Sequence, residues 1–186
     1  MPMCYFDGKI RQLTTIPDTI FEPLYKQVQL SSATWDSTNS AKPNNFQCFH
    51  STEHIIFQFP KSLDNHLESY YTHQWENWKM TIQPLIDHVT KVYNYHNGRT
   101  ARIMLAKLLP HSHIDLHIDQ HVSADIPHKI HIPIITNKEV LFIEEDKGFH
   151  LSPKIAYEVN NKIMHGVINK SDQARIHLIF DFFDSP

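Results

Sequence analysis

The stretch 129-KIHIPIITNKEVLFIEE-145 contains two short runs rich in isoleucine, valine and phenylalanine, separated by turn-forming residues. Runs of this length and composition predict β-strands at 129–136 and 139–145. Similar segments recur after Asn97, at 101–109, 113–118, 154–159, 164–169 and 174–183. Because no helix-length segment separates them, they indicate an antiparallel sandwich or jelly roll and not a parallel α/β sheet.

The first half of the chain has a different pattern. Short strands are expected at 3–6 and 54–59, a helix at about 17–28, and a polar loop at 31–45, with 31–53 as a candidate lid. From 62 to 97 apolar residues recur every three or four positions, which predicts two helices separated at Pro84. We therefore expect one domain, 1–186, in which residues 1–97 support a catalytic core formed by 98–186.

The composition is that of a globular chain. Of its 186 residues 41% are hydrophobic and 20% charged, and the formal net charge of −3 gives no reason to expect nucleic acid or an anionic membrane as partner. No apolar run approaches the ~20 residues that cross a bilayer, so we expect a cytoplasmic protein. Cys4 and Cys48 form no CxxC pair, and a disulfide between them is not expected. The oligomeric state is not indicated.

The segment 111-HSHIDLHIDQH-121 contains four histidines and two aspartates. In a regular strand, side chains alternate between faces, which would place His113, Asp115, His117 and Asp119 on one side and Ile114 on the other. A polar face turned inward is costly unless its groups are paired or bind a metal. With the isoleucines inward, the same polar face would lie in water, and the spacing alone leaves both arrangements open.

A His-x-Asp pair followed about 45 to 50 residues later by a histidine is the ligand set of the facial triad that holds non-haem Fe(II). His117, Asp119 and His165 have this spacing, while His113 with Asp115 is a competing pair. Arg175 follows on the next predicted strand, where a guanidinium could bind a carboxylate through two hydrogen bonds. A metal triad with such an arginine is typical of a 2-oxoglutarate site.

The region from Arg102 to Phe182 resembles the catalytic domain of the aspartyl/asparaginyl β-hydroxylase family of Fe(II)/2-oxoglutarate-dependent oxygenases. Four motifs occur in the family's order: 108-LLPHSHIDLHID-119, 129-KIHIPIITN-137, 157-YEVNNKIMHGVIN-169 and 175-RIHLIFDF-182. The resemblance implies a mainly β fold with flanking helices, built on a double-stranded β-helix (jelly roll, cupin-like) core. It also implies Fe(II), 2-oxoglutarate as cosubstrate, and O2.

The resemblance assigns a role to each matching position. It implies that Arg175 binds the C5 carboxylate of 2-oxoglutarate and that His131 and Lys129 face the cosubstrate. Lysine at 129 departs from the arginine that many members carry, and it lacks the guanidinium fork. Ala106 stands where some members have a hydroxyl group. The Fe(II) ligands implied by the resemblance are His117, Asp119 and His165.

The resemblance implies hydroxylation of an amino acid or of an Asp or Asn residue in a small peptide, with succinate and CO2 as co-products. A hydroxylase of free proline is the alternative within the family. A non-catalytic cupin-like binding module would keep the strands without needing Arg175. An isomerase or hydrolase using zinc or manganese would use the same three ligands and ignore 2-oxoglutarate.

Overall fold

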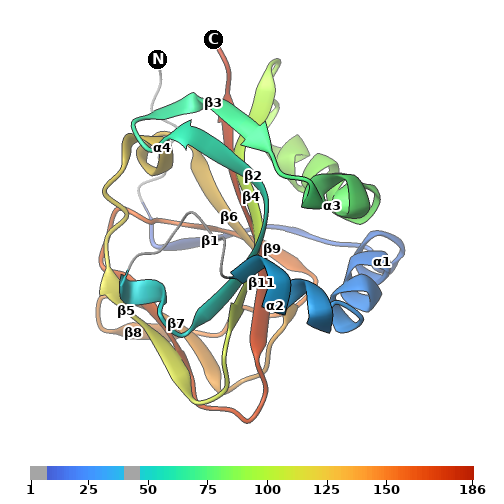
Figure 1. Cartoon of the computed structure of the whole chain (residues 1–186). Helices are drawn as coiled ribbons and strands as arrows, with labels where there is room; N and C mark the ends of the chain where they lie inside the picture. The colour runs from blue at the N-terminus through green and yellow to red at the C-terminus, as the bar shows by residue number, and fades with distance from the viewer. Residues whose placement is uncertain (1–7, 40–46) are drawn as a thin grey trace.

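The structure, a computed structural model, describes residues 8–39 and 47–186 and consists of two antiparallel β-sheets with helices on one side (Figure 1). The larger sheet has the strand order β1 (Ile10–Thr15), β9 (Ile155–Val159), β6 (His128–Ile135), β11 (Arg175–Asp184), β4 (Gly98–Leu108), β2 (Thr52–Ser62) and β3 (Asn65–Tyr71). The smaller sheet has the order β5 (Ser112–His117), β10 (His165–Asn169), β7 (Val140–Glu144) and β8 (Lys147–Phe149). The prediction of a mainly β jelly roll with flanking helices is confirmed.

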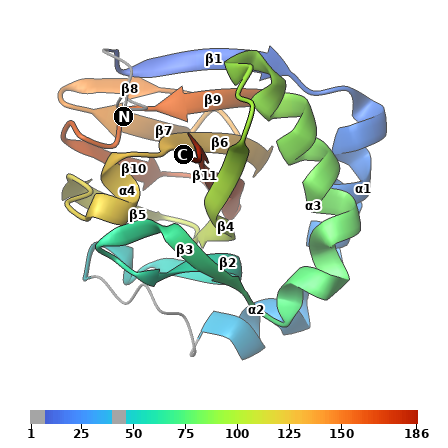
Figure 2. The ribbon, with the colours of Figure 1, turned by 90° about the horizontal axis from the view of Figure 1, so that it is seen from above.

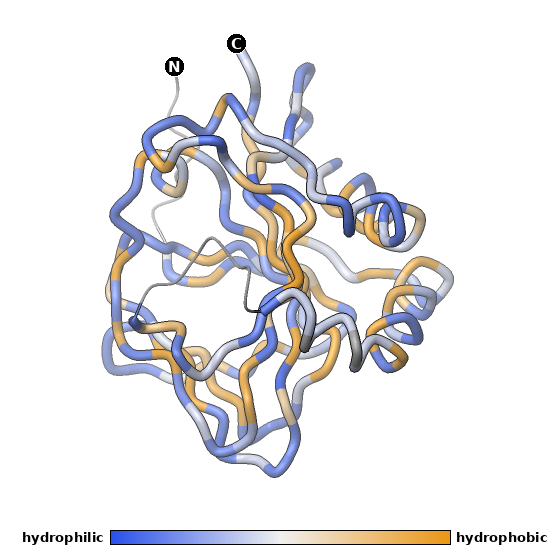
Figure 3. The backbone as a smooth tube through the Cα atoms, viewed as in Figure 1, coloured by the Kyte–Doolittle hydropathy of each residue, from blue (hydrophilic) through white to orange (hydrophobic). Residues whose placement is uncertain are grey.

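Two helices, α1 (Asp18–Gln29) and α3 (Gln74–Thr90), lie side by side against the outer face of the larger sheet (Figure 2). Each buries one apolar side, including Leu24 of α1 and Ile82 of α3, in the main hydrophobic core. Figure 3 shows the hydrophobic segments of the sheet concentrated toward this layer. None of the helices in the described ranges combines the length and apolar character needed to span a membrane.

The two helices predicted within 62–97 are wrong in their number and extent. Residues 65–71 form strand β3, which pairs with β2, and a single helix, α3, continues through Pro84 to a 3-10 turn at Lys91–Tyr93. Pro84 is exposed, and so is Met80, whose carbonyl loses its helical partner there. Because this carbonyl lies on the solvent side, water can satisfy it, and the proline does not end the helix.

The loop predicted at 31–45 is also partly wrong, because Ser32–Asn39 form helix α2. Trp35 is buried in the main core and its indole Nε1 donates to Ser31 Oγ at 3.0 Å. One buried tryptophan therefore stabilises a helix whose other residues are mostly polar. Residues 40–45 and the strand predicted at 3–6 lie outside the described residues.

Shorter elements complete the described chain. A 3-10 turn at Gln47–Phe49 precedes β2, and a four-residue helix, α4 (Val122–Asp125), connects β5 to β6. Strands β1 and β8 were not predicted from the sequence, and each pairs at an edge of its sheet. Cys48 is a free thiol, while Cys4 lies outside the described residues.

Candidate active site

Strands β4, β6 and β11 of the larger sheet present alternate side chains to two different environments. On β11, Ile176, Leu178 and Phe180 pack in the core beneath the helices. Arg175 and Ile179, on the opposite face, line a cavity of about 270 Å³ between the two sheets. The same alternation on β6 places Lys129 and His131 at the cavity and Ile130 and Ile132 in the core.

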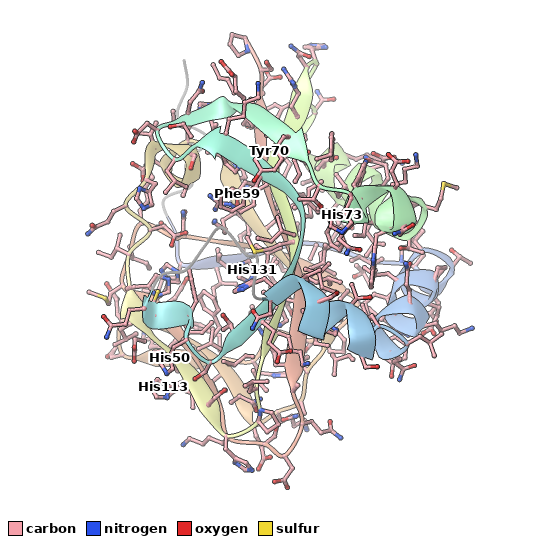
Figure 4. All side chains as sticks on the ribbon, in the orientation of Figure 1. His50, Phe59, Tyr70, His73, His113 and His131 are labelled. Atoms are coloured by element: carbon pink, nitrogen blue, oxygen red, sulfur yellow. The ribbon has the colours of Figure 1, made fainter. Side chains whose placement is uncertain are left out.

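The cavity is bounded by residues from both sheets and from the chain before β2. Apolar and aromatic side chains form most of its exposed wall, and most of the polar side chains that line it are cations or imidazoles. In Figure 4, Phe59 and His131 lie near the middle of the molecule. The apolar and aromatic residues that line the cavity include Phe49, Phe59, Leu63, Met104, Ile118, Phe142 and Ile179.

An irregularity in the β5–β10 pairing decides which histidine of 111–121 faces the cavity. His117 pairs with His165, but the next registered pair is Ile114 with Val167, so one extra residue lies on β5. Ile114 and His117 consequently both line the cavity, while Asp115 and Leu116 are exposed. The regular alternation expected for this segment is therefore wrong, because a β-bulge reverses the facing of side chains within the strand.

The bulge brings three candidate metal ligands together. One donor atom from each of His117, Asp119 and His165 lies within 4.8 Å of the others. Nε2 of His117 lies 3.6 Å from Oδ1 of Asp119, and the two imidazole rings are 4.3 Å apart at their centroids. Two imidazoles and one carboxylate are the donor set that suits Fe(II) in oxygenases. These residues are positioned to hold such an ion with ligand positions left open.

Backbone carbonyls orient both imidazoles for this role. Nδ1 of His117 lies 2.7 Å from the Asp115 carbonyl oxygen, and Nδ1 of His165 lies 2.9 Å from that of Ile163. Since a carbonyl oxygen can only accept, each Nδ1 carries the proton and each Nε2 keeps its lone pair. Metal-binding histidines are usually fixed in this way. Burial also lowers the pKa of His165, which favours its neutral form.

Asp119 is held as a carboxylate. Burial by itself raises its pKa, but positive Lys129, with further contributions from His165 and His117, brings the pKa well below its usual range. Lys129 Nζ lies 3.3 Å from Asp119 Oδ2, and Asn161 Nδ2 donates to the same oxygen at 3.2 Å. The carboxylate therefore needs no deprotonation to accept a metal near neutral pH.

Lys129 has two protein carboxylates as partners. Besides Asp119, its Nζ lies 3.0 Å from Oδ1 of the fully buried Asp181 on β11. The resemblance implied that Lys129 faces the cosubstrate. The register also places Asp181 directly opposite Lys129, so protein carboxylates already pair with this buried ammonium.

Arg175, unlike Lys129, has no carboxylate partner among the described residues. Its guanidinium is buried, donates to His177 Nδ1 at 2.7 Å, and forms no ion pair within the described residues. Its Nε is buried without a hydrogen-bond partner, and burial lowers the pKa of Arg175 to about 9. Burying a cation without an anion is costly, so this geometry suits an anionic ligand.

Neutral imidazoles surround this arginine. Burial, followed by the nearby positive charges, lowers the pKa of His131 and His177 well below the usual range. His177 pairs across the sheet with Ala106, the position at which some members of the family carry a hydroxyl group. Since Ala106 has no hydroxyl, the polar group beside Arg175 is the His177 ring. Nδ1 of His131 is buried without a partner. Both rings thus remain uncharged, His131 at the cavity and His177 beside Arg175.

The competing pair His113 and Asp115 lies outside this arrangement. Their side chains are more than half exposed, and His113 Nε2 lies 3.1 Å from Asp115 Oδ1. Figure 4 shows His113 beside His50 and away from His131. The structure therefore places His117 and Asp119 beside the distal His165 and leaves His113 and Asp115 at the surface.

Comparison with known proteins agrees with this geometry. The family model described as aspartyl/asparaginyl beta-hydroxylase matches residues 69–185, more than half of the chain. The chain belongs to this family. It is a 2-oxoglutarate-dependent dioxygenase with Fe(II) and O2 as the other cofactors. No curated protein sequence matches the chain.

Solved structures share the fold at low sequence identity. A 2OG-Fe(II) oxygenase family oxidoreductase from Burkholderia pseudomallei has a TM-score of 0.61 at 10% identity, covering 95% of this chain and 84% of the other. A prolyl-4-hydroxylase from Pseudomonas putida has a TM-score of 0.55 at 9% identity, covering 97% and 95%. HygX from Streptomyces hygroscopicus, solved with nickel and 2-oxoglutarate bound, has a TM-score of 0.56 at 11% identity, covering 97% and 85%.

Sequence reasoning missed several residues of this aspartyl/asparaginyl β-hydroxylase family member. Gly166 is one: a Cβ there would lie 2.7 Å from the Ile114 carbonyl oxygen, so the close approach of β5 and β10 needs a glycine. Asn161 and Asp181 hold Asp119 and Lys129, and Arg102 pairs with Asp181. In the sequence, Gly166 directly follows the distal histidine His165, and this position could have indicated a close approach of two strands at the site.

Proposed function

We propose that the chain hydroxylates a free amino acid, or an Asp or Asn residue in a short peptide, using an iron centre formed by His117, Asp119 and His165. Arg175 binds the C5 carboxylate of 2-oxoglutarate, and His131 contacts the cosubstrate from the neighbouring strand. When bound, Fe(II) and 2-oxoglutarate activate O2, with succinate and CO2 as co-products and a hydroxyl group added to the substrate. The cavity lies between these residues.

The observation that carries this proposal is the pairing of the triad with a buried, anion-free guanidinium in one cavity. The triad alone also suits zinc or manganese in an isomerase or hydrolase. Such an enzyme has no use for Arg175, which is 2% exposed and whose Nε has no partner. A dicarboxylate cosubstrate supplies the missing anion, and a guanidinium can donate two parallel hydrogen bonds to it.

The remaining contribution of the chain is positioning and exclusion of water. The Phe49 ring meets the His117 ring edge-on at 5.4 Å, and the Phe142 ring stacks on His165 at 5.8 Å. These aromatic contacts cover the ligands, hold their rotamers and keep the centre in an apolar setting. The predicted lid, 31–53, contributes Cys48 and Phe49 to the wall, and residues 40–46 lie outside the described part.

The size and lining of the cavity support a small substrate. About 270 Å³ must accommodate the cosubstrate as well as the reacting part of the substrate. Among the structural relatives, one is a prolyl-4-hydroxylase and another is named as a viral collagen prolyl hydroxylase. A free amino acid or a single side chain of a peptide is consistent with this space, and proline is included among the candidates.

The proposal is tested by measuring succinate formation from Fe(II), 2-oxoglutarate and O2 against amino acids and short peptides, with mass spectrometry for a product heavier by one oxygen atom. We expect one or more substrates to stimulate succinate and to gain oxygen. Zn(II) or Mn(II) should bind and give no turnover. Turnover that is independent of 2-oxoglutarate and O2 would contradict the proposal.

A further inference from the structure

Three charged residues form one row across the cavity face of the larger sheet. Register places Asp181 of β11 opposite Arg102 of β4 on one side and opposite Lys129 of β6 on the other. Arg102 Nη1 lies 3.0 Å from Asp181 Oδ2, and Lys129 Nζ lies 3.0 Å from Oδ1. The buried carboxylate is thus shared by two cations, both of which line the cavity.

The two cations differ in how fully their donors are used. Lys129 contacts Asp119 as well as Asp181, so carboxylates hold its ammonium from two sides. Arg102 forms its one ion pair with Asp181, and its buried Nε has no hydrogen-bond partner in the described part of the chain. Its guanidinium lies 5.1 Å from the centroid of the Phe59 ring, which fixes its plane. Arg102 therefore has unused donor capacity at the cavity.

The balance of charge at the cavity leaves room for one anion. A doubly negative 2-oxoglutarate balances Fe(II), while Asp119 and Asp181 balance two of the three permanent cations Arg102, Lys129 and Arg175. His131 is neutral because burial lowers its pKa. Among the described residues that line the cavity, Asp119 is the one carboxylate. A single positive charge remains. Because the C5 carboxylate of 2-oxoglutarate pairs with Arg175, the cation whose hydrogen-bond donors are then least used is Arg102.

We propose that Arg102 binds a carboxylate of the substrate and so selects molecules that carry one negative charge near the carbon to be hydroxylated. This inference rests on the proposed function, and it narrows the substrate class. Met104 lies between Arg102 and Ala106 along β4 and pairs with Ile179 of β11, and all four residues line the cavity. They offer an apolar surface to the substrate body beyond the anchored carboxylate. Arg102 is then a specificity-determining residue.

A purely structural role for Arg102 makes a different prediction. If the guanidinium only holds Asp181, its removal should lower stability and affect all substrates to the same extent. If it binds the substrate, its removal should act on the acid form of a substrate and leave the uncharged form unaffected. The difference between a free acid and its primary amide therefore separates the two roles.

The experiment compares amino acids with their primary amides as paired substrates in the succinate assay, using the whole chain. For wild type we expect the KM of the amide to exceed that of the acid by about tenfold or more, as for loss of a charge-assisted hydrogen bond. In Arg102→Gln the KM for the acid should rise to that of the amide. Arg102→Lys, which keeps the pairing charge for Asp181 and lacks Nε, should lose most of the preference. Arg99→Gln, an exposed arginine of the same strand, should keep it.

Calorimetric titration of the Mn(II)-loaded protein with 2-oxoglutarate separates this inference from the proposed function. We expect binding in wild type and in both Arg102 variants, since Arg175 holds the cosubstrate. An acid preference that survives in Arg102→Gln and Arg102→Lys, or is absent from wild type, would overturn the role of Arg102 and leave the oxygenase intact. Absence of Mn(II)-dependent binding in wild type would overturn both.

Discussion

The two faces of strands β4, β6 and β11 differ sharply although their residues alternate along the same chain. One face carries Leu105, Ile132 and Leu178, which are fully buried beneath α1 and α3. The other carries the cations and the His131 imidazole that line the cavity, and Asp181, which pairs with two of those cations. One set of strands therefore supplies stability through its outer face and chemistry through its inner face.

The two faces differ in energy because the cavity face contains buried polar atoms that have no hydrogen-bond partner among the described residues. Buried atoms without a partner include Nε of Arg102, Nδ1 of His131, and Nε of Arg175, all at the cavity. Each such group costs about 1 to 3 kcal/mol. Natural proteins keep such costs where a ligand removes them, and compensate through well-packed regions elsewhere. The helix-covered face provides that compensation by burying apolar area.

Truncating one residue on each face tests this division between the two faces most strongly. His165→Ala or His117→Ala should lower kcat/KM by more than about a thousandfold, equivalent to about 4 kcal/mol of transition-state stabilisation, with the unfolding free energy little changed. Leu178→Ala should lower the unfolding free energy by about 2 to 5 kcal/mol and leave the activity per folded molecule near wild type. Succinate assays and denaturant unfolding check both.

His113→Ala is the matched control on the exposed side of the same strand and should retain activity. Full activity in His117→Ala with loss in His113→Ala would move the metal to His113 and Asp115. Loss of activity in Leu178→Ala after correction for the folded fraction would mean that the two faces are not separable.

Gly166→Ala should damage the inner face through the backbone. The added Cβ would lie 2.7 Å from the Ile114 carbonyl oxygen, so β5 must move away from β10. Because His117 and His165 are partners across this pair, we expect Mn(II) affinity to fall by about tenfold or more and stability by about 1 to 3 kcal/mol. Titration of Mn(II) and thermal unfolding measure the two effects. Gly148→Ala, on β8 at the opposite edge of the sheet, is the control, and equal loss of metal affinity there would contradict the argument.

Sequence reasoning succeeded where a local pattern determines structure. The strands after Asn97 and the facing of Lys129 and His131 follow from alternation and residue type. It failed where pairing between distant segments decides. The helical spacing of Leu67 and Tyr70 does not reveal that β2 offers them a strand partner. The bulge that turns His117 inward likewise arises from the pairing with β10.

The ion pairs of the site were beyond local reasoning for the same reason. Lys129 and Asp181 are far apart in sequence and become neighbours only through the β6–β11 register. The resemblance therefore placed Lys129 beside the cosubstrate and did not reveal its protein partner Asp181. The position of Arg102 in the same row could be found only once β4 was placed on the other side of β11.

Arg175→Lys should sharpen the contrast between Arg175 and Lys129, the cation that has protein partners. Lysine keeps the charge and loses the guanidinium fork, so the apparent KM for 2-oxoglutarate should rise by about tenfold, or about 1.4 kcal/mol. Steady-state kinetics with varied 2-oxoglutarate measure this change, and thermal unfolding should show that the fold is retained. An unchanged KM would assign the carboxylate to another residue.

The smallest expected effect concerns Glu144 on β7, whose carboxyl is fully buried opposite His165 with no hydrogen-bond partner in the described ranges. Burial raises its pKa to about 7, with Lys9 acting in the opposite direction and Glu145 in the same direction. The folded state therefore binds a proton that the unfolded state has already released. The contribution of Glu144 to stability is complete below its unfolded pKa and is lost as pH rises toward 7 and beyond.

In Glu144→Gln this loss of stability with rising pH should disappear, because the glutamine side chain stays neutral. The free energy of unfolding of the variant minus that of wild type should rise by about 1 kcal/mol between pH 6 and 7, the slope being limited to about 1.4 kcal/mol per pH unit for one proton. The subtraction is needed because the lowered pKa values of His131 and His177 make stability rise with pH over part of the same range. Glu145→Gln, on the exposed neighbour, should show no such rise. If this difference in unfolding free energy does not change with pH for Glu144→Gln, the Glu144 carboxyl ionises in the folded protein as easily as in water. The inner faces of the two sheets would then be less shielded from solvent than their unpaired buried groups indicate.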